Sequence, residues 1–238
     1  QSNYYVPYEI VQKNNDALRA QFENGQITKV EYDAGLMKFV FGAEAYWVKD
    51  RHEKDRTNCH IILLAKNEEG RRDINEALAD ANIDGYYSQP RLDLELLLRI
   101  KPENVMVTTA CVKYWVYEDI EEITDILHKH FGDNFYLEVQ YHNTNIQKKL
   151  NQRILEISNK KGIDIILGYD SHFIYESDSI ERNNYLEGRG IKYDDDEIGW
   201  YMDYPTDREA ERRLREQGVL SDEEIIRCMD NTDKILEF

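Results

Sequence analysis

Short apolar runs recur along the middle of the chain and alternate with longer amphipathic segments. Runs rich in aromatic and β-branched residues predict five strands, at 38–48, 60–65, 105–111, 135–140 and 163–167. Apolar residues at three- and four-residue spacing predict helices between most of these strands, including one that carries Ile120, Ile123 and Leu127. A repeated strand–helix order predicts an α/β fold with a mainly parallel sheet or barrel.

Both ends of the chain are predicted to be helical and polar. The later of two helices expected in the C-terminal part, 221–236, begins with Ser221 followed three residues on by Glu224, a capping-box pattern. An acidic run at 194–197 is expected to be a solvated loop rather than a metal site. The pattern therefore divides the chain into a helical lead-in, a barrel core and a helical extension, at 1–37, 38–175 and 176–238.

Composition places the chain among globular proteins, with 238 residues, 41% hydrophobic and 32% charged. No apolar run approaches a membrane span, and the first residues carry no signal peptide and no initiator Met. Three widely spaced cysteines indicate a reducing, cytoplasmic setting. The net charge of −17 argues against tight binding to a phosphate backbone by this chain alone. It leaves metal-assisted phosphate chemistry open, because a metal reverses the local charge.

The strand predicted at 163–167 leads directly into Asp170 and His172. In an extended segment, residues two apart point to the same side. A carboxylate and an imidazole facing one point at a strand end suit a divalent metal or an acid/base pair. The competing interpretation is an Asp that caps the next turn beside a half-buried His.

Other strand ends offer further candidate ligands: Glu44, Cys111 and His142. The carboxyl ends of parallel strands lie on one rim, so side chains distant in sequence can converge there. Zinc accepts imidazole, thiolate and carboxylate, and manganese or iron would take the His and carboxylate members. Cys111 fits equally well as a plain buried residue. His60 begins its strand, which puts it on the opposite rim if that strand is parallel, and a structural role is expected for it.

Several segments together resemble one known family. Residues 131–142, FGDNFYLEVQYH, resemble the "FGDNFYLEIQ-H" segment of the PHP (polymerase and histidinol phosphatase) domain, which begins bacterial replicative DNA polymerase III α subunits. Residues 60–70 resemble its "HLILLAKNEEG", and residues 86–93 its "YYKPRID". Shorter blocks match "GIEAY", "SGC" and "D-x-HY" at 42–46, 109–111 and 170–173. Residues 230–232 resemble the "ENT" segment that leads towards the polymerase palm.

The resemblance implies a distorted (β/α)7 barrel with a metal site. Its ligands carry over to Glu44, Cys111, His142, Asp170 and His172, with His60 and Arg91 as neighbours that would orient them. The implied cofactor is a divalent metal, zinc or manganese, at partial occupancy. The family's opening H-x-H strand and "TDH" strand have no counterpart here. The chain is therefore expected to start downstream of them, with an incomplete barrel and up to half of a trinuclear site absent.

Three functions remain open. The first is the PHP domain of a DNA-directed DNA polymerase, a nucleotidyltransferase of DNA replication. Its site would serve phosphoesterase or 3′–5′ exonuclease-like chemistry, or only structure. Its partner would be the rest of the polymerase α chain, and it would meet DNA only through the full polymerase, with no membrane involved; alone, this piece is expected to be inactive. The second is a stand-alone PHP phosphatase, and the third a non-catalytic interaction scaffold.

Overall fold

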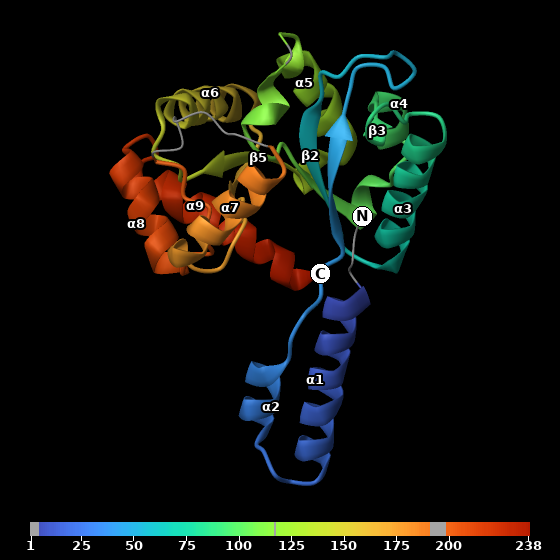
Figure 1. The fold of residues 1–238 in the computed structure, drawn as a ribbon. Helices are drawn as coiled ribbons and strands as arrows, with labels where there is room; N and C mark the ends of the chain where they lie inside the picture. Colours follow the sequence, from blue (N-terminus) through green and yellow to red (C-terminus); the bar gives the residue numbers. More distant parts are fainter. Residues whose placement is uncertain (1–4, 117, 191–198) are drawn as a thin grey trace.

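A twisted sheet forms the centre of the molecule (Figure 1). The computed structural model describes residues 5–116, 118–190 and 199–238. Within these ranges the sheet has six strands in the order β3-β1-β2-β4-β5-β6. The strands are β1 (Gly42–Trp47), β2 (Cys59–Ala65), β3 (Arg91–Leu92), β4 (Val105–Thr108), β5 (Phe135–Gln140) and β6 (Ile165–Gly168).

Strand β2 runs against its two neighbours, whereas the other pairs are parallel. It pairs antiparallel with both β1 and β4, while β1–β3, β4–β5 and β5–β6 are parallel. The segment between β1 and β2 contains no helix. A parallel return requires a crossover connection, usually helical, so this segment can only turn the chain back on itself. The mainly parallel α/β sheet expected from the sequence is confirmed, with this one reversal.

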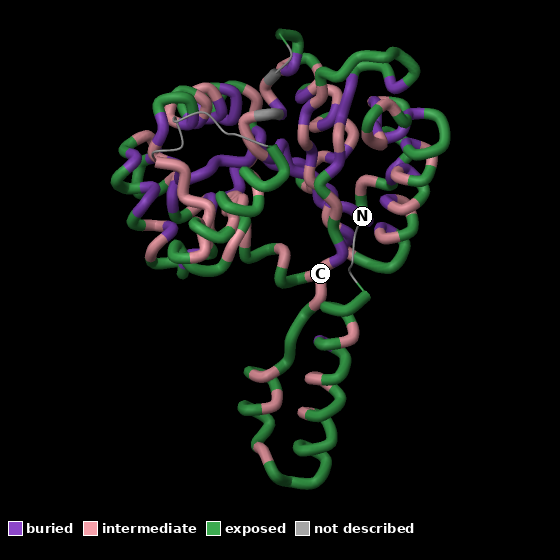
Figure 2. The backbone as a smooth tube through the Cα atoms, in the orientation of Figure 1, coloured by how far each residue is buried: buried purple, intermediate pink, exposed green. Residues whose placement is uncertain are grey.

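Helices pack on one face of the sheet and create the core there. Side chains that alternate along the strands, such as Ile61, Leu63 and Val107, are fully buried against them. Gly162 ends the helix Asn145–Lys161 in the left-handed conformation expected of a helix stop, with φ of 69°. Figure 2 shows this buried centre beneath exposed helix surfaces. The helices that follow the first strands are α3 (Glu68–Ile83), α4 (Leu94–Leu97), α5 (Ile120–Phe131) and α6 (Asn145–Lys161).

A helical hairpin at the N-terminus projects from the sheet domain (Figure 1). It consists of α1 (Tyr5–Glu23) and α2 (Lys29–Gly35). The rings of Phe22 and Tyr32 stack across it, 5.0 Å apart between centroids. Asn15 closes its base by accepting from the backbone N–H of Met37 and donating to the Met37 carbonyl. Most of its surface is exposed (Figure 2).

The last of three C-terminal helices, α9 (Asp222–Asp233), covers the free edge of β6. It is preceded by α8 (Asp207–Gln217) and by α7 (Ser179–Gly188), which the sequence pattern did not predict. The side chain of Asn231 donates to the Ile165 carbonyl at 2.7 Å. Thr232 Oγ1 accepts from the Leu167 N–H at 3.2 Å, and its one proton is shared between the carbonyls of Leu167, at 3.2 Å, and Cys228, at 3.0 Å. Two side chains of α9 thus take the place of a further strand.

The capping box at the start of α9 is confirmed, because Ser221 and Glu224 bond each other's backbone N–H groups. The acidic run at 194–197 lies outside the described residues. No helix within the described ranges is both long enough and apolar enough to cross a membrane.

Replacing Asn231 tests the closure of the β6 edge. Asn231→Leu keeps the side-chain volume but leaves the buried Ile165 carbonyl without its donor, so we expect a loss of about 1–3 kcal/mol of unfolding free energy. Urea unfolding followed by circular dichroism measures it. The matched control is Asp230→Asn, an exposed neighbour on the same helix. A variant as stable as the control would mean that the edge needs no closure.

Candidate functional site

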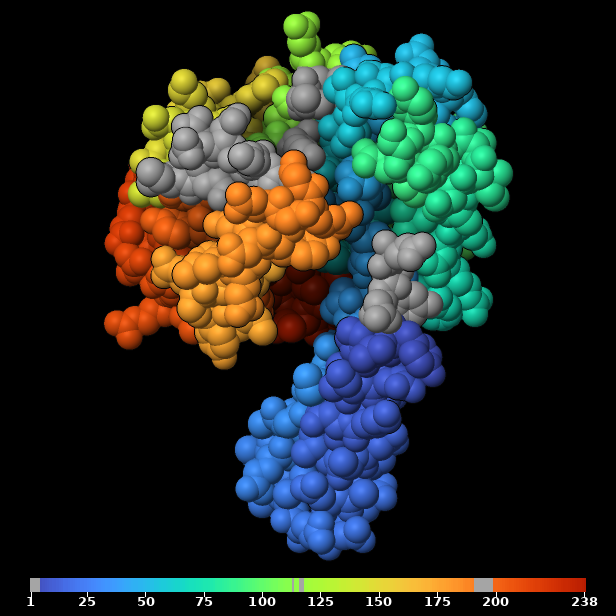
Figure 3. All heavy atoms as spheres, in the orientation of Figure 1, coloured from blue at the N-terminus to red at the C-terminus, as the bar shows by residue number. Residues whose placement is uncertain are grey.

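A cavity of about 340 Å³ lies on the face of the sheet opposite the helix-packed core. Ile62, Leu64 and Thr108 line it and alternate along their strands with core residues. Ile235, from the C-terminal segment, lines it too. In Figure 3, that segment is visible in a hollow beneath the residues of α7. The polar lining includes Glu44 and Glu138 from within β1 and β5, together with Gln140, Cys111 and Asp170 at or just past the rim where most strands end.

Glu44, His60 and Cys111 meet at this rim. His60 Nδ1 lies 2.6 Å from Glu44 Oε1 and 3.4 Å from Cys111 Sγ. The expectation of His60 on the opposite rim is wrong, because β2 is antiparallel and therefore begins where its neighbours end. The Glu44 side chain is 48% exposed. Glu44 lies within β1, but its side chain points to the open side of the sheet, so the strand does not bury it.

The carboxylate that is deeply buried is Glu138, in the middle of β5. It accepts hydrogen bonds from Thr108 Oγ1 at 2.6 Å and from Gln140 Nε2 at 2.9 Å. Burial raises the pKa of Glu138 to about 7, and the nearby acids Asp170 and Glu44 push it the same way. A Cβ on Gly168 would overlap its carboxyl group. The sequence analysis missed Glu138, although a carboxylate inside an apolar strand was the available signal.

Asp170 and His172 form an ion pair, with 3.6 Å between Oδ1 and Nε2. The pairing lowers the pKa of Asp170 and raises that of His172. Asp170 adopts a left-handed backbone with φ of 48°, so the chain leaves the extended conformation before it. The alternation argument therefore does not apply, although the two side chains do meet.

His142 is buried beneath a segment that the sequence analysis did not single out. Its Nδ1 accepts the backbone N–H of Tyr201 at 3.1 Å, and its ring packs 4.7 Å from that of Trp200. Gln217, from α8, donates to its carbonyl. Burial lowers the pKa of His142 to about 4, so the imidazole is neutral near pH 7. Nothing in the sequence around Trp200 and Tyr201 indicated that these residues would cover His142.

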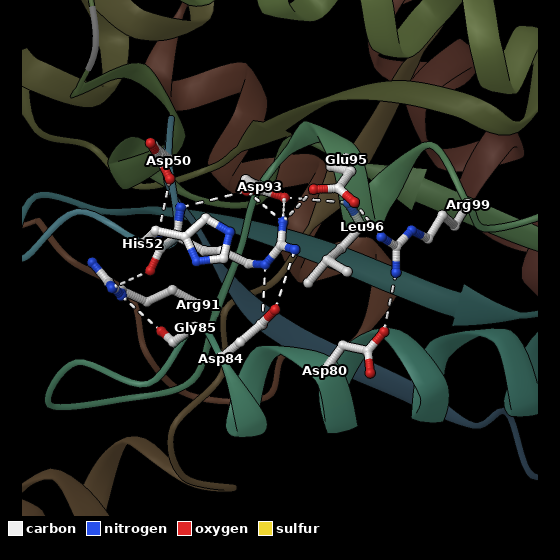
Figure 4. Close-up of polar contacts among 11 residues, drawn as sticks. Asp50, His52, Asp80, Asp84, Gly85, Arg91, Asp93, Glu95, Leu96 and Arg99 are labelled. Atoms are coloured by element: carbon white, nitrogen blue, oxygen red, sulfur yellow. Dashed lines mark hydrogen bonds and ion pairs between the residues drawn. The ribbon is translucent and has the colours of Figure 1, made fainter.

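The Arg91 side chain binds the backbone of the β1–β2 connection and of neighbouring residues; the close-up in Figure 4 shows its guanidinium. Its guanidinium donates to the carbonyls of Gly85, Arg51, Glu53 and Asp55 at 2.6–3.0 Å. Four backbone acceptors thus occupy the group that was expected to orient metal ligands. The buried Arg51 in turn pairs with carboxylates of the α3–α4 region: Asp84, Asp93 and Glu95.

The metal that the family resemblance implies needs several donor side chains placed around one point. Within residues 5–116, 118–190 and 199–238, no group of three or more His, Cys, Asp or Glu side chains is placed to hold an ion. The candidates are engaged in pairs instead, Glu44 with His60 and Asp170 with His172. A ligating histidine must offer an unprotonated nitrogen. The pairing with Asp170 raises the pKa of His172, and His142 already uses Nδ1 as an acceptor. This arrangement does not fit a multi-ligand metal site.

The reversed strand, the open sheet and the polar cavity at the strand ends define a barrel-related α/β domain. Comparison with known families matches residues 8–142 to the PHP domain. Since the match spans more than half of its length, the chain belongs to the PHP domain family. Glu44, Cys111 and His142 lie within the matched range, and Asp170 and His172 follow it.

Curated relatives point to one type of protein. The chain is 29% identical over 178 residues to a DNA polymerase III subunit alpha of Borreliella burgdorferi, covering 68% of this chain and 15% of that protein. The Aquifex aeolicus protein of the same name is 30% identical over 161 residues, covering 60% and 14%. That of Thermus aquaticus is 27% identical over 158 residues, covering 60% and 13%. The chain thus spans about 15% of the length of the curated relatives that it matches.

Glu138 predicts a pH dependence of stability. Its pKa rises from an ordinary 4.5 to about 7 on folding, so between these values only the unfolded chain releases the proton, and stability falls as pH rises. Glu138→Gln removes this dependence. Between pH 4 and pH 8 we expect the variant to gain on the order of 3 kcal/mol relative to wild type. Urea unfolding at both pH values measures it.

The matched control is Glu156→Gln, an exposed carboxylate on α6. Its difference from wild type should stay the same at both pH values. If Glu138→Gln behaves like this control, the Glu138 carboxyl is ionised in the folded protein, and the assigned pKa is wrong.

Proposed function

We propose that this chain is the PHP domain of a bacterial or phage-type DNA polymerase III α chain and that it acts as a structural brace rather than as a phosphoesterase. The observation that carries the proposal is the internal pairing of the rim residues: Glu44 with His60, and Asp170 with His172. Residues 38–175 would form the barrel core, between the lead-in 1–37 and an extension, 176–238, that leads towards the palm. Its place is the cytoplasm, where the replicative polymerase works.

The chemistry of phosphodiester cleavage supports a structural role. A metal-dependent phosphoesterase needs one ion to generate hydroxide and usually a second to take up charge on the leaving oxygen. Here Glu44 and Asp170 are each paired with a histidine, and burial raises the pKa of Glu138 to about 7. Because they are paired in this way, the candidate ligands at the rim could hold at most one divalent ion, zinc or manganese. A stand-alone phosphatase is less well supported, because the relatives described above are DNA polymerase III α subunits.

Metal content and hydrolysis test this role directly. We expect at most about one zinc or manganese ion per chain and no hydrolysis of a chromogenic phosphodiester above the blank, because the rim side chains are paired and a catalytic ion needs three protein ligands. Elemental analysis and an absorbance assay in added metal measure both. Two or more tightly held ions, or an activity that His172→Ala removes, would contradict the proposal.

Binding to DNA gives a second test. A net charge of −17 opposes contact with a phosphate backbone, so we expect duplex binding no tighter than about 10⁻⁶ M at physiological salt. Fluorescence anisotropy with a labelled duplex measures it. Sub-micromolar, sequence-independent binding would mean that this domain meets DNA by itself rather than through the full polymerase.

The structural role is best tested in the full-length gene product that contains this sequence. Primer extension should survive His172→Ala at the wild-type rate, because the proposal gives that side chain no part in catalysis. Asn231→Leu should instead lower the temperature at which extension is lost, since it weakens the edge of the domain. Loss of extension in the first variant without loss of stability would overturn the structural role. A gene product without polymerase activity would overturn the assignment to a polymerase.

A further inference from the structure

Residues 199–204, which we call the strap, cross the ends of β5 and β6 and join them. At one end, the Asn143 N–H donates to the Gly199 carbonyl at 2.7 Å. At the other, the His172 N–H donates to the Met202 carbonyl at 2.8 Å, and Ser171 Oγ donates to the Asp203 carbonyl at 2.9 Å. The strap is therefore tied to the residues that follow both strands.

A buried arginine of α8 holds the strap down. Arg213, only 6% exposed, forms a bidentate pair with Asp203, with both distances 2.7 Å. Its guanidinium also lies over the Tyr201 ring, 4.4 Å from the centroid, and over that of Tyr141, at 5.3 Å. A planar charged group that is paired and stacked at once fixes its neighbours more firmly than a single contact does.

The strap determines which nitrogen of His142 carries the proton. A neutral imidazole has one N–H donor and one acceptor nitrogen. The Tyr201 backbone N–H can only donate, so Nδ1, 3.1 Å away, must be the acceptor. The proton then resides on Nε2, which is buried and has no hydrogen-bond partner among the described residues. A protonated Nε2 cannot bind a metal, and Nδ1 is occupied.

We propose that the strap is a latch that withholds His142 from metal binding by fixing its tautomer. When the strap lifts, Nδ1 is free to carry the proton, and Nε2 then has the lone pair that a metal needs. Tyr201 acts as a positioning residue through its backbone, and Trp200 packs against the ring that is held. The latch concerns this contact alone and holds whether or not the chain serves a polymerase.

The test removes the donor without removing the histidine. Tyr201→Pro lacks the backbone N–H, whereas Tyr201→Phe keeps it and keeps the ring over Arg213. Nitrogen-15 NMR of the histidines should show His142 protonated at Nε2 in wild type and Tyr201→Phe, and a larger share of the Nδ1-protonated form in Tyr201→Pro. Zinc titration by calorimetry should give about 2- to 12-fold tighter binding for Tyr201→Pro, the range expected from one hydrogen bond.

A second variant reaches the strap from its other end. Gly199 has φ of 98°, and a Cβ there would lie 2.7 Å from the Asn143 carbonyl oxygen, so Gly199→Ala displaces the strap while every backbone N–H remains. It should shift the tautomer and the zinc affinity in the same direction, and adding His142→Ala should abolish the gain in each variant. An Nδ1-protonated His142 in wild type would overturn the latch. So would zinc affinities of the folded variants equal to that of Tyr201→Phe.

Discussion

The reversal of β2 is the constraint on which the candidate site depends. Because β2 enters the sheet where its neighbours leave it, its first side chains lie beside their last ones, and His60 reaches Glu44 and Cys111. The connection that turns the chain back is held by buried guanidinium groups. Arg91 gathers its carbonyls, and Arg51 ties it to the α3–α4 region. These two residues act on the site only by fixing the turn that brings its members together.

Local patterns were a good guide to the elements and a poor one to their directions. The apolar run at 135–140 coincides with β5, and Gly162 and Ser221 mark a helix end and a helix start as their chemistry requires. Strand direction depends on what joins two strands, and period-two patterning looks the same in both directions. The left-handed Asp170 and the strap over His142 depend on tertiary contacts that no local spacing encodes.

The rim shows how an acidic protein can keep carboxylates close together. Glu44 is half exposed and pairs with His60, and the partly exposed Asp170 pairs with His172. Glu138 lies between them, and its pKa is about 7. Solvent and a histidine partner offset the negative charge of Glu44 and of Asp170, whereas Glu138 avoids a buried charge by keeping its proton. The sequence pattern singled out Glu44 but not Glu138, because which strand carboxylate is buried depends on how each face of the sheet is covered.

The edge of β6 has a consequence for how this sequence can be shortened. Asn231 and Thr232 saturate backbone groups that would otherwise form an open row at the end of the sheet. Such a row is a template for a strand from another molecule. A piece of the sequence that stopped at Gly218, before α9, would keep all six strands but leave the outer edge of β6 unpaired and open to another strand. Helix α9 therefore also prevents strand addition between molecules, and a shortened protein must keep its last turn to avoid it.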